Sequence, residues 1–169
     1  MARDEVAALF RRLSAGVYVI GTSDGARRDA FTAAWLMQVS FDPLLLALSI
    51  NPEHASYPLL HAGRGFTVSV LRAGQEEVAR HFGTSSGREG DKLGGQAWRR
   101  SGRGAPILTD ALAWLECELA GGLPAGDHEV VLGRVTDGRL LAPDASPLLY
   151  GDTGDMDGSL ALYPESLRS

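Results

Sequence analysis

The chain has very little cysteine, one residue among 169, so no internal disulfide can hold its fold together. It also lacks a basic surplus, because 16 Lys and Arg against 21 Asp and Glu give a formal net charge of −5. That balance disfavours nucleic acid and anionic membranes as partners. No apolar run approaches the roughly 20 residues that cross a bilayer, and charges interrupt residues 1–13, where a signal segment would be apolar. We therefore expect a cytoplasmic protein that binds neither nucleic acid nor membrane.

Apolar residues and glycine are abundant instead. Hydrophobic residues make up 44% of the sequence, which is enough for a sizeable core, and the length suits one domain. The 21 glycines indicate many tight turns and close backbone approaches rather than a helix bundle. We expect a single domain over residues 1–169.

Strand patterns dominate the first third of the chain. A strand over residues 17–23 runs into Asp24-Gly25, a strong hairpin signal, and a long return strand is predicted over residues 28–40. Residues 44–50 form a continuous apolar run, which predicts a central strand buried on both faces.

Short helices and further strands follow from the same kind of pattern. Helices are predicted over residues 4–13, 56–63 and 76–82, further strands over residues 66–70, 113–119, 128–136 and 147–150, and a loop over residues 83–104. Six or so strands with hairpin signals and few, peripheral helices favour a closed or nearly closed β-barrel.

Familiar motifs for phosphate, metal and nucleophile chemistry are incomplete. Gly63-Arg64-Gly65 precedes a strand instead of opening a helix, which disfavours a dinucleotide site of the Rossmann type. Residues 153–158 lack the first and last ligands of a calcium loop and are interpreted as a solvated acidic turn. The four histidines show no metal-ligand spacing, so no metal site is expected. Cys117 lies mid-strand among apolar residues and is expected to be an inert core thiol.

Five segments, taken in order, resemble a known family. They are Ala30 to Trp35 followed by Val39 to Pro43, Leu46 to Asn51, Ala105 to Leu108, Ala113 to Cys117, and Pro124 to His128. With them the chain resembles, from about residue 14 to 150, the flavin reductase-like proteins of the FMN-binding split-barrel class. The resemblance implies a mainly β fold, a Greek-key split β-barrel with short peripheral helices, that forms a homodimer with FMN in a groove between the subunits.

The resemblance also implies an activity. It is that of an FMN-binding oxidoreductase that transfers a hydride from NAD(P)H to flavin and passes the electrons to free flavin, a partner oxygenase or another acceptor. An alternative of a different class is an FMN-binding electron-transfer module that is reduced by a protein partner. A dimeric barrel without a site is the third possibility.

The candidate flavin-binding residues lie mainly in the first half of the chain. They are Phe31, Thr32, Ala33, Ala34, Trp35, Val39, Ser40, Ser49, Ile50, Asn51, His54, Ser56, Tyr57, Phe82, Gly83 and Lys92. A flavin ring has a polar edge that needs hydrogen-bond donors and one face that must stay open to a hydride donor. Small residues at 32–34 let backbone N–H groups approach such a ring, and Ser40 can reach a polar edge atom or the ribityl chain.

The phosphate of FMN is expected at the His54-Ala55-Ser56-Tyr57 turn, where a helix begins and Ser56 is its predicted N-cap. Tyr57 stands where relatives often have threonine. The segments holding Phe82-Gly83 and Lys92 match ones that approach the flavin in relatives.

His128 is the candidate catalytic residue. The resemblance places it near the nicotinamide, where a neutral imidazole can hydrogen-bond the carboxamide or the cofactor phosphate. Two departures from the family pattern bear on the nicotinamide: Trp35 is larger than the usual residue, and the basic residues common after the last strand are replaced by residues 148–155.

Overall fold

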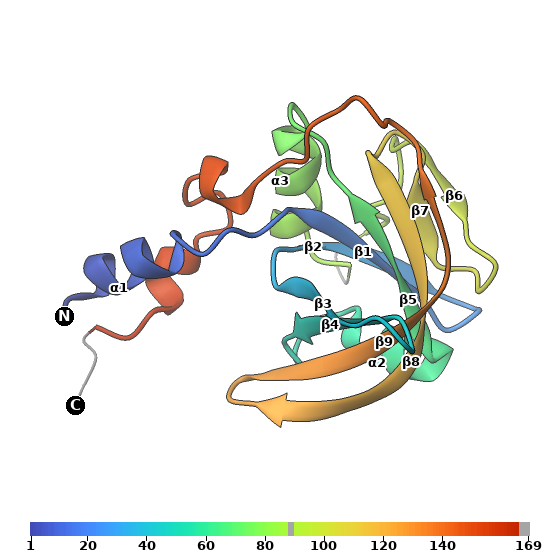
Figure 1. Cartoon of the computed structure of the whole chain (residues 1–169), viewed down its shortest axis with the longest axis horizontal. Helices are drawn as coiled ribbons and strands as arrows, with labels where there is room; N and C mark the ends of the chain where they lie inside the picture. Colours follow the sequence, from blue (N-terminus) through green and yellow to red (C-terminus); the bar gives the residue numbers. More distant parts are fainter. Residues whose placement is uncertain (88–89, 166–169) are drawn as a thin grey trace.

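The structure, a computed structural model, describes residues 1–87 and 90–165. As predicted, the described part is mainly β and is built on an antiparallel sheet of seven strands in the order β2-β1-β5-β8-β9-β4-β3 (Figure 1). The strands are β1 (Tyr18–Ser23), β2 (Arg28–Ala33), β3 (Leu36–Ser40), β4 (Leu45–Ile50), β5 (Gly65–Val70), β8 (Ala113–Ala125) and β9 (His128–Leu140). A second, two-stranded sheet pairs β6 (Trp98–Arg100) with β7 (Pro106–Leu108).

The two edge strands of the large sheet, β2 and β3, are consecutive in the sequence. Only Ala34 and Trp35 separate them, so the Cα atoms of Ala33 and Leu36 lie at most roughly 11 Å apart. The sheet must therefore curl until its two edges approach each other. They meet at this corner without pairing as strands, which gives the split β-barrel that the sequence predicted.

The single strand predicted over residues 28–40 is wrong, because this corner divides it in two. The N–H of Leu36 donates to the Ala34 carbonyl (3.1 Å), and the N–H of Ser49 on β4 donates to the Trp35 carbonyl (3.0 Å). The apolar alternation continues across the corner, so the sequence period alone gave no sign of it.

Strand β4 is buried on one face, not on both as its apolar run predicted. Leu46, Leu48 and Ile50 are buried, while the residues between them are half-buried. The reason is that the sheet is antiparallel, so one face is turned to the barrel core, where Phe66 and Val131 also lie. β4 is also next to the sheet edge, between β9 and β3, rather than at its centre.

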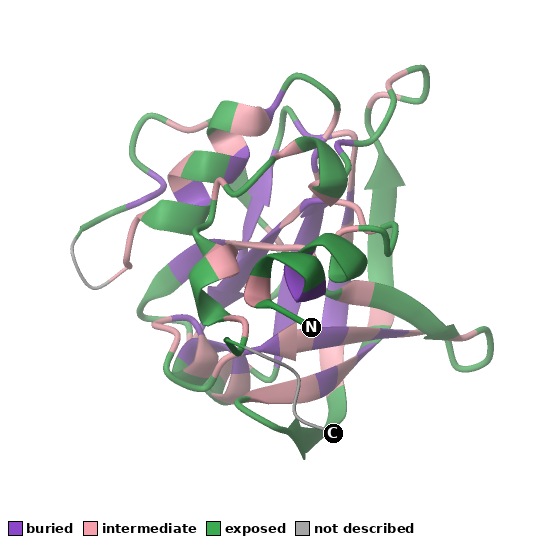
Figure 2. Cartoon of the chain, turned by 90° about the vertical axis from the view of Figure 1, so that its left-hand side faces the viewer, coloured by how far each residue is buried: buried purple, intermediate pink, exposed green. Residues whose placement is uncertain are grey.

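Helices lie outside the barrel. The predicted helices at 56–63 and 76–82 are confirmed as α2 (Tyr57–Gly63) and α3 (Glu76–Thr84). The first helix, α1 (Arg3–Phe10), ends earlier than predicted. It contacts the 3₁₀ helix η2 (Ser159–Leu162), and together they form an arm beside the barrel that is largely exposed (Figures 1 and 2).

Two other expectations fail in detail. The segment 83–104, expected to be a loop, contains β6, whose three residues are too short for a periodic signal. Residues 147–150 form no strand but make isolated bridges through Pro147 to Arg72 and through Leu149 to Gly16. In the part of the chain that the structure describes, no helix is long and apolar enough to span a membrane.

Candidate functional site

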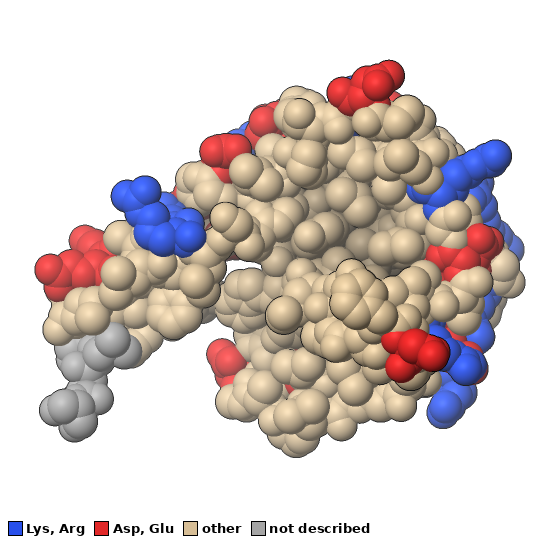
Figure 3. All heavy atoms as spheres, in the orientation of Figure 1, with Lys and Arg blue, Asp and Glu red and all other residues tan. Residues whose placement is uncertain are grey.

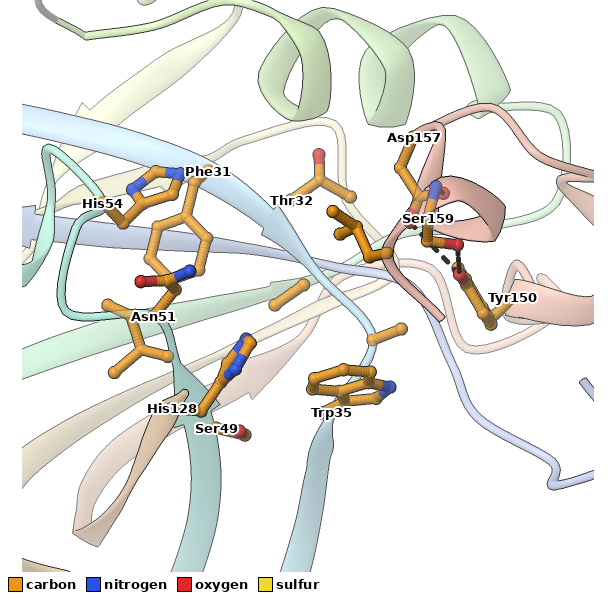
Figure 4. A pocket seen from close by; sticks show the side chains of 14 residues that line it. Phe31, Thr32, Trp35, Ser49, Asn51, His54, His128, Tyr150, Asp157 and Ser159 are labelled. Atoms are coloured by element: carbon orange, nitrogen blue, oxygen red, sulfur yellow. Dashed lines mark hydrogen bonds between the residues drawn. The ribbon is translucent and has the colours of Figure 1, made fainter. Parts of the chain in front are cut away.

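An open groove with a cavity volume of about 200 Å³ lies at the corner between β2 and β3 (Figure 4). Three parts of the chain line it: this corner, the end of β4 with the loop and β9 residue beside it, and the segment after β9. The lining residues are Phe31, Thr32, Ala33, Ala34, Trp35, Ser49, Ile50, Asn51, His54, His128, Tyr150, Asp157, Ser159 and Leu162. All but the last four were predicted from the sequence as site residues.

The floor of the groove is small and apolar. The Thr32 hydroxyl donates to the Ala79 carbonyl of α3 (2.6 Å), so its hydrogen is committed to the barrel rather than to the groove. Ala33 and Ala34 follow and add only methyl groups. Because their side chains are so small, a flat ring can approach the backbone here.

His128 and Trp35 stand together at one side of the groove. Their ring centroids lie 5.0 Å apart with the planes tilted by 56°, and Figure 4 shows both rings turned toward the groove. His128 opens β9, directly after the turn at Gly126 and Asp127. Asp127 Oδ1 lies 2.8 Å from His128 Nδ1. Since an ionised carboxylate only accepts hydrogen bonds, Nδ1 is the donor in this contact, and in a ring that carries no second proton Nε2 is an acceptor.

The Asp127 contact also has an electrostatic signature. The hydrogen bond from His128 holds the pKa of the Asp127 carboxyl below its usual range. Asp127 is therefore ionised near neutral pH, where it can accept the hydrogen bond from His128 Nδ1 and orient the ring. Its side chain is exposed, so the contact orients the ring without contributing much stability.

His54 and Asn51 form the opposite end of the groove from Tyr150 (Figure 4). The His54 ring packs on Phe31 with 4.5 Å between centroids, and its Nδ1 accepts from the Ser56 N–H at 3.3 Å. Asn51 Oδ1 accepts from the Glu53 N–H (2.9 Å). Both polar side chains are thus held in place by the loop before α2.

Ser56 and Lys92, predicted phosphate and flavin contacts, do not line the groove. Ser56 is fully buried and donates through Oγ to Asp29 Oδ2 (2.7 Å). Lys92, also buried, places Nζ 3.5 Å from Asp29 Oδ1. Burial lowers the pKa of Lys92, and the charge of Asp29 opposes that shift. Both side chains thus contact the buried carboxylate of Asp29 on β2, a residue that was not predicted to take part in the site.

Tyr57 is likewise turned elsewhere. Its hydroxyl donates to Glu129 Oε2 (2.5 Å), which raises the pKa of the Tyr57 phenol. His61 Nε2 lies 3.1 Å from the same oxygen. These contacts tie α2 to the residue after His128, so Tyr57 supports the groove from outside it.

The remaining predicted residues are dispersed. Val39 and Ser40 lie further along β3, and Val39 is exposed. Phe82 is buried in the core beneath α3. Gly83 lines a smaller cavity of about 70 Å³ that shares Thr32, Ala33, Ala34, Tyr150 and Asp157 with the groove. None of the four lines the groove itself.

The wall formed by residues 150–162 is not predicted by the sequence pattern. Tyr150 follows Leu149, the residue that bridges to Gly16. The Tyr150 hydroxyl lies 3.1 Å from Asp157 Oδ2 and 2.9 Å from Ser159 Oγ. Leu162 completes this wall. The acidic turn at 153–158 has the composition of a solvated turn, and nothing in its local pattern shows which distant strand it meets.

The groove meets the chemical requirements of a flavin ring. It has a flat apolar floor, polar side chains at its rim and one open side, and among its described lining residues there is no Lys or Arg. Its volume is below the roughly 300 Å³ at which small-molecule sites usually begin, so a bound ring would need a second cover. No group of His, Cys, Asp and Glu in residues 1–87 and 90–165 is placed to hold a metal ion.

Comparisons with known proteins show the family of the chain. The model of the flavin reductase like domain matches residues 10–159. Diflavin flavoprotein A 1 of Synechocystis is 34% identical over 130 residues, which are 76% of this chain and 23% of that protein. High molecular weight rubredoxin of Moorella thermoacetica is 36% identical over 140 residues, which cover 82% of this chain and 61% of that protein.

A solved structure shows the same fold. The NADH:FAD oxidoreductase SgcE6 of Streptomyces globisporus superposes with a TM-score of 0.82 at 30% identity, covering 89% of this chain and 90% of that one. By contrast, the chain spans about a quarter of the length of the diflavin flavoproteins it matches.

Proposed function

The chain belongs to the flavin reductase like domain family, and from that premise we propose that it is an oxidoreductase that binds FMN and reduces it with NAD(P)H. The observation that carries the proposal is the groove at the β2–β3 corner, which is lined by the small residues Ala33 and Ala34 and by the His128 ring, packed on Trp35. A relative of similar length is an NADH:FAD oxidoreductase by name, which supports both the flavin and the nicotinamide.

A bound flavin would supply the redox chemistry, accepting a hydride and releasing electrons later. The chain's own residues would position the reactants, since the groove needs no nucleophile for this reaction. The Ala33-Ala34 floor would hold the ring close to the backbone. His128 Nε2, an acceptor when Asp127 binds Nδ1, would receive a hydrogen bond from the nicotinamide carboxamide.

We assign the phosphate of FMN to the His54 end of the groove. His54 and Asn51 are the polar side chains there, and both are held by the loop. Ser56, Tyr57 and Lys92 would act indirectly, by fixing this loop and the neighbouring strands through Asp29 and Glu129.

A homodimer would complete the site. The groove is small and open, and edge strand β3 with the turn after it exposes Met37 (64%), Val39 (45%) and Phe41 (89%). An unpaired apolar edge of this kind is typical of an interface. In Figure 3 many of the Lys and Arg side chains in view lie at the edge far from the arm, a further group lies on the arm itself, and the hollowed centre of the view is mostly uncharged.

A second candidate, an electron-transfer module reduced by a protein partner, is supported by the relatives. Several are much longer than this chain, and one is a high molecular weight rubredoxin. The final acceptor would then be another protein rather than free flavin or an oxygenase. The buried, unpaired Cys117 suits the cytoplasmic location that we propose for either function.

Anaerobic mixing of the FMN-loaded protein with NADH or NADPH tests the choice. A reductase loses the visible absorbance of oxidised flavin with at least one nucleotide, and His128→Ala slows this loss by roughly 10- to 100-fold while FMN affinity stays nearly unchanged. Reduction by dithionite alone would favour the protein-reduced module. Failure to bind FMN or FAD at micromolar concentration would contradict both candidates, and loss of FMN in the variant would show that His128 contacts the flavin.

A further inference from the structure

The C-terminal wall gives the groove its one acidic group. Among the described lining residues, Asp157 has the only carboxylate, and none of them is Lys or Arg. Figure 4 shows Asp157 with Tyr150 and Ser159 on the side of the groove away from His54. The groove therefore has a polar end suited to an anion and a distant acidic end that repels one.

The carboxylate of Asp157 is held in place by hydrogen bonds but can still accept further ones. Its Oδ2 lies 3.1 Å from the Tyr150 hydroxyl, and its Oδ1 accepts from the Ser159 N–H at 3.1 Å. Each carboxylate oxygen has two lone pairs, so each can accept a further hydrogen bond. Asp157 is exposed to solvent, which leaves it accessible to a bound nucleotide.

The two nicotinamide nucleotides differ at a single group that a carboxylate distinguishes. NADH has a hydroxyl at the 2′ position of its adenine ribose, which donates hydrogen bonds, whereas NADPH has a phosphate there, which is anionic. A carboxylate accepts from ribose hydroxyls, while the 2′-phosphate is usually bound by Arg. The lining of this wall, with a carboxylate and no Lys or Arg, suits the ribose hydroxyl of NADH rather than the 2′-phosphate of NADPH.

We propose that Asp157 contacts the adenine ribose and makes the groove select NADH against NADPH. The proposal rests on the proposed reductase function and adds the identity of its hydride donor. His128 and Trp35 would take the nicotinamide and the His54 end the flavin phosphate, which leaves the C-terminal wall for the rest of the dinucleotide. Because the carboxylate is exposed, we expect a preference of about tenfold, the size of a repulsion screened by water.

Two measurements on three proteins test this proposal. The wild type and Asp157→Asn are compared with the matched control Asp152→Asn, which removes the same charge from a residue of the same segment that does not line the groove. Calorimetry gives the dissociation constants of NAD⁺ and NADP⁺, and anaerobic reduction gives kcat/KM with NADH and NADPH. Asp157→Asn should strengthen NADP⁺ binding by about tenfold. It should change NAD⁺ binding by no more than about threefold, because the amide oxygen still accepts.

Ionic strength provides an independent readout. Since the discrimination is electrostatic, it should shrink as salt rises in the wild type and in Asp152→Asn, but not in Asp157→Asn. A conformational defect would not produce this pattern.

Several results would overturn the proposal. They are equal binding of the two nucleotides by the wild type, an unchanged preference in Asp157→Asn, a parallel loss of both nucleotides, or loss of flavin affinity in that variant. Wild-type protein that is reduced by both nucleotides equally would contradict this proposal alone. Wild-type protein that is reduced by neither would contradict the reductase function, and the proposal with it.

Discussion

The groove has two walls of different construction. One, from Phe31 to Trp35 with Ser49 and His128, belongs to paired strands whose backbones are fixed on both sides of the corner. The other, residues 150–162, contains only 3₁₀ turns and is held by side-chain bonds around Tyr150 and by contact with α1. We infer that the two walls have different roles. The strand wall positions the flavin ring, whereas residues of the C-terminal wall can be substituted without disturbing the barrel.

Loss of the buried Asp29 carboxylate on β2 should destabilise the protein more than a change in the groove itself. Asp29→Asn removes the charge that faces Lys92 and leaves a buried ammonium group without a counter-ion. We expect a loss of about 3 kcal/mol in the free energy of unfolding, measured by urea denaturation. The double variant Asp29→Asn/Lys92→Met should recover most of that loss, because the uncompensated charge is gone.

An equal loss in the single and double variants would show that the Ser56 hydrogen bond, rather than the ion pair, carries the stability. The comparison of the walls would still hold in that case. It would fail if Asp29→Asn left stability unchanged, since the strand wall would then lack the rigid support described here.

The strand wall was largely predictable from the sequence, and the reason is local. Apolar alternation, the Asp24-Gly25 hairpin and the apolar run at 44–50 each act over a few residues, and they located β1, β2 and β4. The family resemblance then pointed to the residues on these strands. The corner at Ala34 escaped prediction because a bend in the backbone leaves the side-chain period intact.

The C-terminal wall and the partners of Ser56 were not predictable for the opposite reason. Tyr150 and Asp157 reach the groove only because the chain crosses the barrel after β9, a path that no local pattern records. Ser56 is a residue type typical of helix N-caps, yet its hydroxyl donates a hydrogen bond to Asp29, which lies 27 residues earlier. Contacts between distant residues decide such roles, and they follow from the fold rather than from spacing.

A bulky side chain at Ala34 tests whether the strand wall holds the flavin ring. Ala34→Leu places a bulky side chain where a flat ring must lie, so flavin affinity should fall by roughly 10- to 100-fold, the usual cost of overpacking. Ala34 is only half-buried, so the unfolding free energy should change little. Flavin fluorescence quenching measures the affinity, and Ala8→Leu on the exposed part of α1 is the control. Unaltered affinity would place the ring away from this floor.

Loss of the Tyr150 hydroxyl from the C-terminal wall should change nucleotide preference and stability only modestly. Tyr150→Phe removes the hydroxyl that contacts Asp157 and Ser159 and keeps the ring. One hydrogen bond of this kind contributes about 1 kcal/mol. Since it positions Asp157 indirectly, we expect the NADH preference to fall by only about threefold. Flavin affinity should stay close to wild type, and the free energy of unfolding should fall by no more than about 1 kcal/mol.

The pH dependence of this contact follows from the Tyr150 phenol. Burial raises its pKa above the ordinary value of 10.0, so the hydroxyl keeps its proton and remains a donor throughout the neutral range. The nucleotide preference should therefore not change through titration of Tyr150 between about pH 6 and 9. Above pH 10 the unfolded chain loses this proton first, the folded chain binds more protons, and stability falls as pH rises. Tyr150→Phe should remove that alkaline component.

If Tyr150→Phe instead keeps the wild-type nucleotide preference but binds flavin more weakly, Tyr150 contacts the flavin ring, and the two walls do not have the separate roles described above.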